Sequence, residues 1–174
     1  MGGRIRVGLD RLAAALVDVA GWMLVAMVVL ISVEILGRYF FRFSTLIADE
    51  YSGYLFVWAT FLGFAHALRT GQFLRVEMLV VRLAPRLRNA LEILAAAAGL
   101  VVAAIAAWGT WKLVYTSWRF GSLSIQPSAT PLLIPQLIMP LGLLLLCLLY
   151  VEEIWRRLAG DVGPAAAPTI PRSE

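Results

Sequence analysis

Four stretches of this sequence are apolar and almost free of charged side chains, and short polar segments separate them. Drawn with their flanking residues, they predict helices at about 12–36, 51–68, 90–113 and 131–151. A helix rises about 1.5 Å per residue, so helices of this length cross the roughly 30 Å of hydrocarbon in a bilayer. The pattern therefore predicts an all-α integral membrane fold with four transmembrane helices.

The last of these helices is expected to be irregular. Prolines recur at Pro127, Pro131, Pro135 and Pro140. Proline has no N–H to donate and displaces the preceding helical turn. We therefore expect the regular helix to begin near Pro131 and to bend farther along, with the freed carbonyls bonded to neighbouring helices.

The arginines predict the orientation of the chain. They are concentrated in residues 1–11, in 69–88 and after 151, which share one side of a four-span protein. Cytoplasmic segments carry the excess of Lys and Arg, so both termini are expected inside the cell. Residues 1–11 form the cytoplasmic N-terminus in this prediction. Residues 152–174, rich in glycine, proline and alanine toward their end, form a mobile cytoplasmic tail.

The segment between the second and third spans has its own periodicity. If residues 72–87 are drawn as a helix with 100° per residue, Arg75, Arg82 and Arg86 lie on one face and apolar residues lie on the other. This favours a short amphipathic helix on the membrane surface, in contact with membrane lipids. The alternative is that the two spans extend past the membrane and meet in a loop.

Composition excludes several classes of function. Hydrophobic residues make up 61% of the 174 residues, charged residues 15%, and the net charge is only +4, without the clustered basic face that nucleic-acid binding requires. There is one cysteine, Cys147, and one histidine, His66. Disulfide exchange needs at least two cysteines, and paired haem ligation and structural zinc need more Cys or His ligands than this chain has. We therefore expect no enzyme activity, no cofactor, no metal and no nucleic-acid partner.

A few polar residues in or near the spans are candidates for function. Glu34 and Arg38 lie four residues apart on one helix face, and Asp49 and Glu50 open the second span. Ionisable groups at membrane depth often relay ions or protons. They can equally form an ion-paired clasp between the outer ends of two helices, which is the interpretation we favour. His66 is either a proton carrier or, more simply, a structural hydrogen-bonding residue.

Several motifs together resemble one family of transporter subunits. They are Arg38-Tyr39-Phe40-Phe41, Ala48-Asp49-Glu50, the run 56–63, the run 68–77 and the proline-rich segment 130–136. Their order and spacing are similar to those of the small membrane (DctQ-like) subunit of tripartite ATP-independent periplasmic (TRAP) transporters. The resemblance covers roughly residues 20–150.

The resemblance implies a non-catalytic scaffold in the inner membrane of a bacterium or archaeon. Its implied partners are a large membrane subunit, which binds substrate and sodium, and a periplasmic substrate-binding protein that captures an organic acid. The implied structural and interface residues are Arg38, Tyr39, Asp49, Glu50, Trp58, Gly63, Arg69, Gly71, Arg75, Pro131 and Pro135. The alternative function is a small self-contained proton-coupled exporter that uses Glu34.

Overall fold

The computed structural model describes residues 2–42, 47–70 and 85–159. Its helices are α1 (Gly2–Phe41), α2 (Ile47–Arg69), α4 (Pro85–Phe120), α5 (Leu133–Gln136) and α6 (Ile138–Leu158). Within the described residues the only β interaction is an isolated antiparallel bridge between Leu123 and Pro131. The predicted all-α fold is therefore confirmed.

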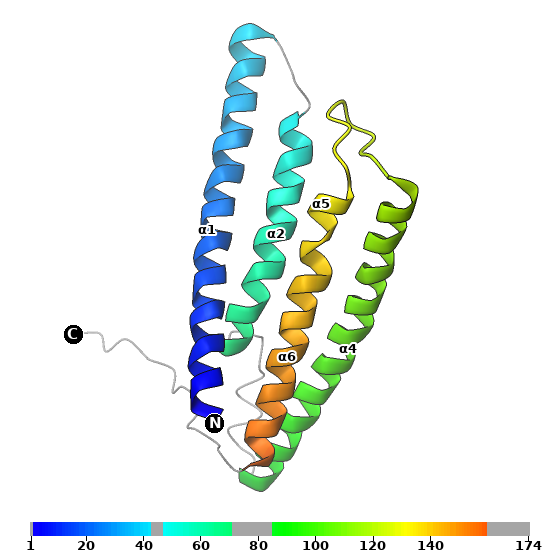
Figure 1. Ribbon diagram of the computed structural model, residues 1–174. Helices are drawn as coiled ribbons and strands as arrows, with labels where there is room; N and C mark the ends of the chain where they lie inside the picture. Colours follow the sequence, from blue (N-terminus) through cyan, green and yellow to red (C-terminus); the bar gives the residue numbers. More distant parts are fainter. Residues whose placement is uncertain (1, 43–46, 71–84, 160–174) are drawn as a thin grey trace, which may run out of the picture.

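The long helices stand side by side in the order α1, α2, α6, α4 (Figure 1). α2 packs between α1 and α6, and α6 packs between α2 and α4. Small and aliphatic side chains fill the seams: Ala20, Ala59 and Leu62 lie buried between α1 and α2, and Ala103, Ala107, Leu143 and Leu146 lie buried between α4 and α6. The molecule is thus a row of helices with α1 and α4 at its outer edges.

One narrow stripe of α1 faces the rest of the protein. The more shielded side chains recur alternately three and four residues apart, and they include Leu9, Ala13, Leu16, Ala20, Met23, Met27, Leu30, Glu34 and Gly37. This heptad spacing is that of two helices packed along a single seam. The opposite side of α1 is exposed among the described residues, and Trp22 there is 75% exposed.

Three helical stretches are long and apolar enough to cross a membrane: Val7–Phe40, Leu87–Phe120 and Leu133–Leu158. α2 is not among these stretches, and it carries Ser52, Thr60 and His66 along its length. A helix between two others can carry such groups, since its polar side chains have protein neighbours. Three of the four predicted spans are thus found among the described residues, and the span at 51–68 stays a prediction.

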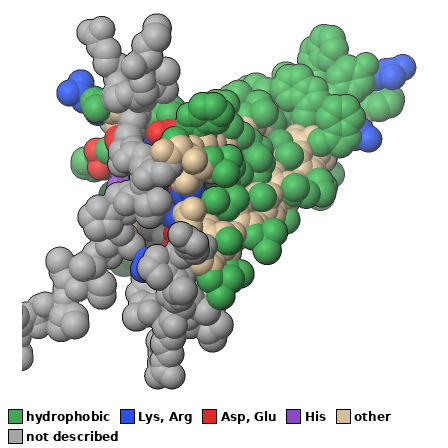
Figure 2. All heavy atoms as spheres, turned by 90° about the horizontal axis from the view of Figure 1, so that it is seen from below, with side chains coloured by type: hydrophobic (Ala, Val, Ile, Leu, Met, Phe, Trp, Pro, Cys, Tyr) green, Lys and Arg blue, Asp and Glu red, His purple; other side chains and the backbone are tan. Residues whose placement is uncertain are grey.

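The surface of the helices is apolar as well. Trp22, Ile105 and Leu148 are each more than half exposed, and they lie on α1, α4 and α6. Seen from below, the visible face of the row is largely hydrophobic, with acidic and basic side chains gathered near its ends (Figure 2). Exposed apolar area on this scale is unusual for a protein in water and suits contact with lipid or with other membrane helices.

The outer helices are longer than predicted. α1 occupies residues 2–41 rather than 12–36, and α4 occupies 85–120 rather than 90–113. Each added residue contributes a backbone hydrogen bond, and charged pairs four residues apart support the ends outside the apolar run. Pro85 opens α4, where its missing N–H has no intrahelical partner to lose.

A compact connection joins α4 to α5. Gly121 has a φ of 56°, and the Ser122 N–H donates to Ser117 O at 3.0 Å, which closes the last turn of α4. The Ser124 N–H then donates to Thr130 O at 2.9 Å, across the bridge of residues 123 and 131. The segment between the two helices is therefore a hydrogen-bonded hairpin, and Ile125 at its tip is fully exposed.

The proline-rich helix is interrupted where the prolines require it. α5 begins at Leu133, two residues after Pro131, and the break between α5 and α6 falls at Leu137. Pro140 has no N–H to donate to the carbonyl of Gln136 four residues earlier. Pro140 is fully buried and Pro135 is buried, so these two prolines lie against neighbouring helices, whereas Pro127 and Pro131 are exposed.

Two predictions lie outside the described residues. They are the amphipathic surface helix at 72–84 and the part of the tail from residue 160 onward. The prediction of a mobile tail over 152–174 is wrong for its first residues, because α6 continues to Leu158 and ion pairs hold its last turns.

Candidate functional site

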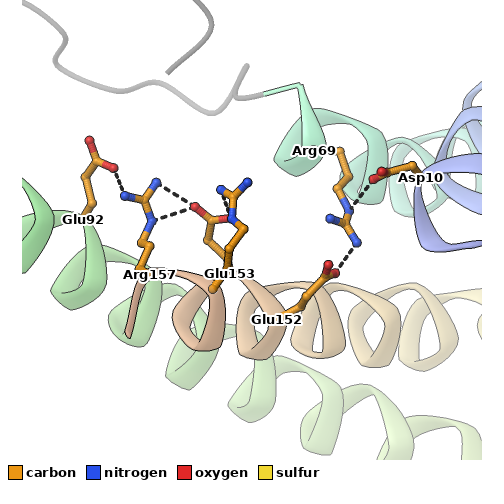
Figure 3. A network of polar contacts seen from close by, with 7 residues as sticks. Asp10, Arg69, Glu92, Glu152, Glu153 and Arg157 are labelled. Carbon is orange, nitrogen blue, oxygen red and sulfur yellow. Dashed lines mark hydrogen bonds and ion pairs between the residues drawn. The ribbon is translucent and has the colours of Figure 1, made fainter. Parts of the chain in front are cut away.

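Arg69 contacts side chains of two other helices at the end of the bundle where α1 begins and α2 ends. It ends α2, and its guanidinium lies between Asp10 of α1 and Glu152 of α6 (Figure 3). Arg69 Nε is 3.3 Å from Asp10 Oδ1, an ion pair without hydrogen-bond geometry, while Nη2 donates to Glu152. The Arg69 side chain is 19% exposed, so much of this pairing is shielded from water.

A second arginine continues the network to α4. Arg157 of α6 is only 7% exposed. Its Nε and Nη2 both contact Glu153 Oε1 on the same helix, at 2.7 and 2.6 Å. Its Nη1 forms an ion pair with Glu92 of α4 (Figure 3). Arg88 Nε donates to the other oxygen of Glu92 at 3.1 Å, and Arg156 Nη2 to Glu153 Oε2 at 2.5 Å. Together with Arg69 these residues form what we call the basal network, defined by Asp10, Arg69, Arg88, Glu92, Glu152, Glu153, Arg156 and Arg157. It joins all four long helices.

Sequence reasoning had assigned most of these arginines only to orientation. The pairs Arg88 with Glu92 and Glu153 with Arg157 are visible as charges four residues apart on one helix. The contacts between helices could not be found in this way, because they depend on which helices are neighbours. Asp10 and Glu152 are far apart in the sequence, and only the row order brings both to Arg69.

At the opposite end of the bundle, where α1 ends and α2 begins, Arg38 joins these two helices. Its Nε donates to Glu34 Oε1 at 3.2 Å, and its Nη2 donates to Asp49 Oδ2 at 3.3 Å. Arg38 and Asp49 are both largely exposed, so in water such pairs would contribute little. The geometry is that of a clasp between the ends of two helices.

Glu50 faces away from this clasp and toward the hairpin. Its carboxylate accepts hydrogen bonds from Ser128 and, at 2.5 Å, from Tyr54 OH, and the residue is 8% exposed. Burial opposes ionisation, but the donated hydrogen bonds, led by that of Ser128, outweigh it and hold the pKa of Glu50 below the ordinary glutamate value. The two adjacent acids therefore serve different neighbours: Asp49 pairs with α1 and Glu50 with the hairpin.

Further polar contacts join α2 to the hairpin and to α5, and α2 then packs closely against α6. Tyr51 OH lies 3.2 Å from Thr130 Oγ1, and the Trp58 indole N–H donates to Pro135 O at 3.2 Å. A Trp58 donor for a carbonyl at the helix break is what a proline-interrupted membrane helix requires. Near the middle of the seam, a Cβ built on Gly142 would lie 2.9 Å from Phe61 O, so the two backbones approach closely there.

The remaining residues predicted to be structural or at the subunit interface differ in their surroundings. Tyr39 is 79% exposed and packs edge-on against Phe40, and Gly63 has open space where a side chain would be. Pro131 forms the hairpin bridge, and Pro135 is buried in α5. Gly71 and Arg75 lie outside the described residues.

The described residues contain no group of three or more His, Cys, Asp or Glu side chains placed to hold a metal ion. The carbonyl of His66 accepts hydrogen bonds from the N–H and hydroxyl of Thr70, each at 2.9 Å. The thiol of Cys147 packs beside the core between α4 and α6. What the polar residues do in this structure is hold helices together.

These features define a class: a multi-pass helical membrane protein whose polar residues connect helices to one another. Comparison with protein families then identifies the group. Residues 27–160 match the family described as tripartite ATP-independent periplasmic transporters, DctQ component. The chain belongs to this family, the small permease component of TRAP transporters, as the sequence motifs indicated. A comparison with curated proteins found no match.

Proposed function

We propose that this chain is a non-catalytic scaffold that assembles with the large membrane subunit of a TRAP transporter and supports docking of a periplasmic substrate-binding protein. In this proposal the large subunit binds the organic acid and the sodium ions, and the complex lies in the inner membrane of a bacterium or archaeon. Family membership supplies the kind of complex.

One observation supports the scaffold role: contacts follow α2 along its whole length, from the hairpin and α5 to α6. Glu50 bonds to Ser128 of the hairpin, Trp58 bonds to Pro135 of α5, Gly142 of α6 lies close to the α2 backbone, and the basal network joins the other ends of α2 and α6. A subunit that moved during transport would need a seam that can slide or open. Fixed contacts support a static role against which a partner can move.

Glu34 counts against the exporter alternative. A proton-coupled exporter of four helices needs a carboxylate that titrates freely at membrane depth. Here the Glu34 carboxylate accepts a hydrogen bond from Arg38 at 3.2 Å near the end of α1. An ion-paired acid at a helix end is poorly suited to carry protons across the membrane.

We expect that this chain, purified and reconstituted alone, transports no organic acid. The three-part system should show sodium-dependent uptake of radiolabelled substrate, and deletion of this subunit should abolish it. The matched control is the complex without its binding protein. Sodium-dependent uptake by the isolated chain would contradict the scaffold role.

We also expect four spans with both termini in the cytoplasm. In a Cys147→Ala background, a cysteine replacing the fully exposed Ile125 should react with a membrane-impermeant maleimide from the periplasm. A cysteine replacing Thr70, at the other end of α2, should react only after the membrane is opened. Labelling of both positions from the same side would refute α4 as a span, and periplasmic labelling of position 70 with a protected position 125 would refute α2 as a span.

A further inference from the structure

Asp18 of α1 stands apart from the other acidic residues. Asp10, Asp49, Glu50, Glu92, Glu152 and Glu153 all take part in ion pairs or hydrogen bonds, and Glu34 pairs with Arg38. Among the residues that the structure describes, Asp18 is the only acid with no hydrogen bond or ion pair, and its side chain is exposed. It lies inside the candidate span Val7–Phe40. A carboxylate in such a position is costly without a partner.

The depth of Asp18 follows from the ion pairs at the two ends of α1. Asp10 pairs with Arg69 at one end, and Arg38 pairs with Asp49 at the other. At about 1.5 Å per residue, these ends are about 42 Å apart, with Asp18 about 12 Å and Trp22 about 18 Å from Asp10. A hydrocarbon layer of roughly 30 Å centred between the ends contains Asp18 and has Trp22 near its middle.

Asp18 and Trp22 share the side of α1 that faces away from α2. The helical angle of Asp18 is opposite the stripe formed by residues such as Ala13, Ala20 and Met27. Trp22, one turn later, is 75% exposed. Tryptophan in contact with lipid prefers the membrane surface, where its N–H finds a partner, so an exposed indole at mid-depth is better accounted for by a protein neighbour.

The outer edge of the row formed by α4 has a different character. Its exposed aromatic residues, Trp111, Tyr115 and Trp118, gather toward one end of the helix, and Lys112 lies over the Trp108 ring at 5.3 Å from its centroid. Clustered aromatic side chains near a helix end are typical of anchors at the lipid headgroups. α4 thus has the features of a lipid-facing edge, whereas α1 has a carboxylate and an indole at depth.

Charge decides which occupant fits the α1 face. A second copy packed symmetrically on this face would bring two Asp18 carboxylates toward each other, and like charges repel at membrane depth. Lipid tails offer no hydrogen-bond donor. A membrane helix that carries a positively charged side chain would satisfy the carboxylate and cover Trp22.

We propose that the face of α1 carrying Asp18 and Trp22 is the docking surface for the large membrane subunit, with a cationic side chain of that subunit beside Asp18. This inference rests on the proposed function for the existence of that subunit. It adds the helix, the face and the chemistry of the contact.

The first test is photo-crosslinking in the assembled complex. A photoreactive phenylalanine analogue replacing Trp22 should capture the large subunit, and the same analogue replacing Ile105, which is 68% exposed on α4, should not. Capture of a second copy or of lipid alone from position 22, in a complex that still co-purifies, would overturn the docking face and leave the scaffold function standing. Failure of the unmodified chain to co-purify with the large subunit would overturn both.

The second test changes the charge. Asp18→Lys should lower the large subunit retained per copy of this chain by at least about tenfold, because it places like charges together. Ile105→Lys puts the same charge on the other edge and should leave the ratio unchanged. Asp18→Leu should also weaken retention, while the melting temperature of the isolated chain stays the same or rises, since Asp18 has no contact among the described residues to lose. Normal retention with both Asp18 variants would refute the proposal.

Discussion

Arg157→Met should destabilise the isolated subunit more than any other single change at the basal network. Arg157 is 7% exposed and provides the contact between α6 and Glu92 of α4. Removing one partner of a buried ion pair leaves an uncompensated charge and costs about 3 kcal/mol or more. Arg88 and Arg156 still contact Glu92 and Glu153, so the loss should lie at the lower end of that range. Thermal unfolding in detergent, followed by tryptophan fluorescence, measures it.

The neighbouring arginine gives the matched control. Arg156 is less buried and contacts only Glu153 on its own helix, so Arg156→Met should cost under about 1 kcal/mol. A Glu92→Gln change added to Arg157→Met should recover part of the lost stability, because it removes a shielded carboxylate that has lost one of its two arginine partners and keeps only Arg88. Equal melting temperatures for the two arginine variants would show that Arg157 does not join α4 to α6.

The helices themselves could be predicted because length and apolarity act locally. The spans at 12–36 and 90–113 lie within α1 and α4, whose ends extend beyond the apolar runs, and the span at 131–151 corresponds to α5 and α6 from Leu133 onward, interrupted at Leu137. The break at Leu137 follows from proline chemistry that can be read in the sequence. The helix predicted at 51–68 lies within α2, and its crossing of the membrane stays a prediction.

The clasp between Arg38 and Asp49 was predicted, but most other contacts between helices could not be, because they depend on which helices are neighbours. The sequence places Arg38 near Asp49 through a short connection, but it does not distinguish the roles of Asp49 and Glu50. Ser128, the partner of Glu50, comes from a hairpin 78 positions away. The family motifs contain Asp49 and Glu50 as a pair, and only the fold separates them into one contact with α1 and one with the hairpin.

Gly142 illustrates a feature with almost no sequence signal, a glycine in a leucine-rich run whose role depends on a neighbouring helix. Gly142→Ala should destabilise the subunit by about 1–3 kcal/mol, the usual cost of overpacking. Its Cβ would lie 2.9 Å from Phe61 O and 3.0 Å from Phe61 Cβ. Because the nearest atom belongs to the α2 backbone, α2 and α6 would have to move apart.

Two other glycines separate this effect from a general response to alanine. Gly63→Ala has open space around the new methyl group and should be neutral or slightly stabilising, since alanine favours helix over glycine. Gly99→Ala would meet the ring of Tyr150 at 2.6 Å, but a side chain can turn aside, so its cost should be intermediate. Melting temperatures in the order Gly63→Ala, Gly99→Ala, Gly142→Ala, highest first, are the expected result.

Because the α2 and α6 seam is the part proposed to stay fixed during transport, Gly142→Ala should also lower uptake by the assembled system. Unchanged stability with Gly142→Ala would mean that the two backbones are free to separate, and the scaffold argument would lose its central contact.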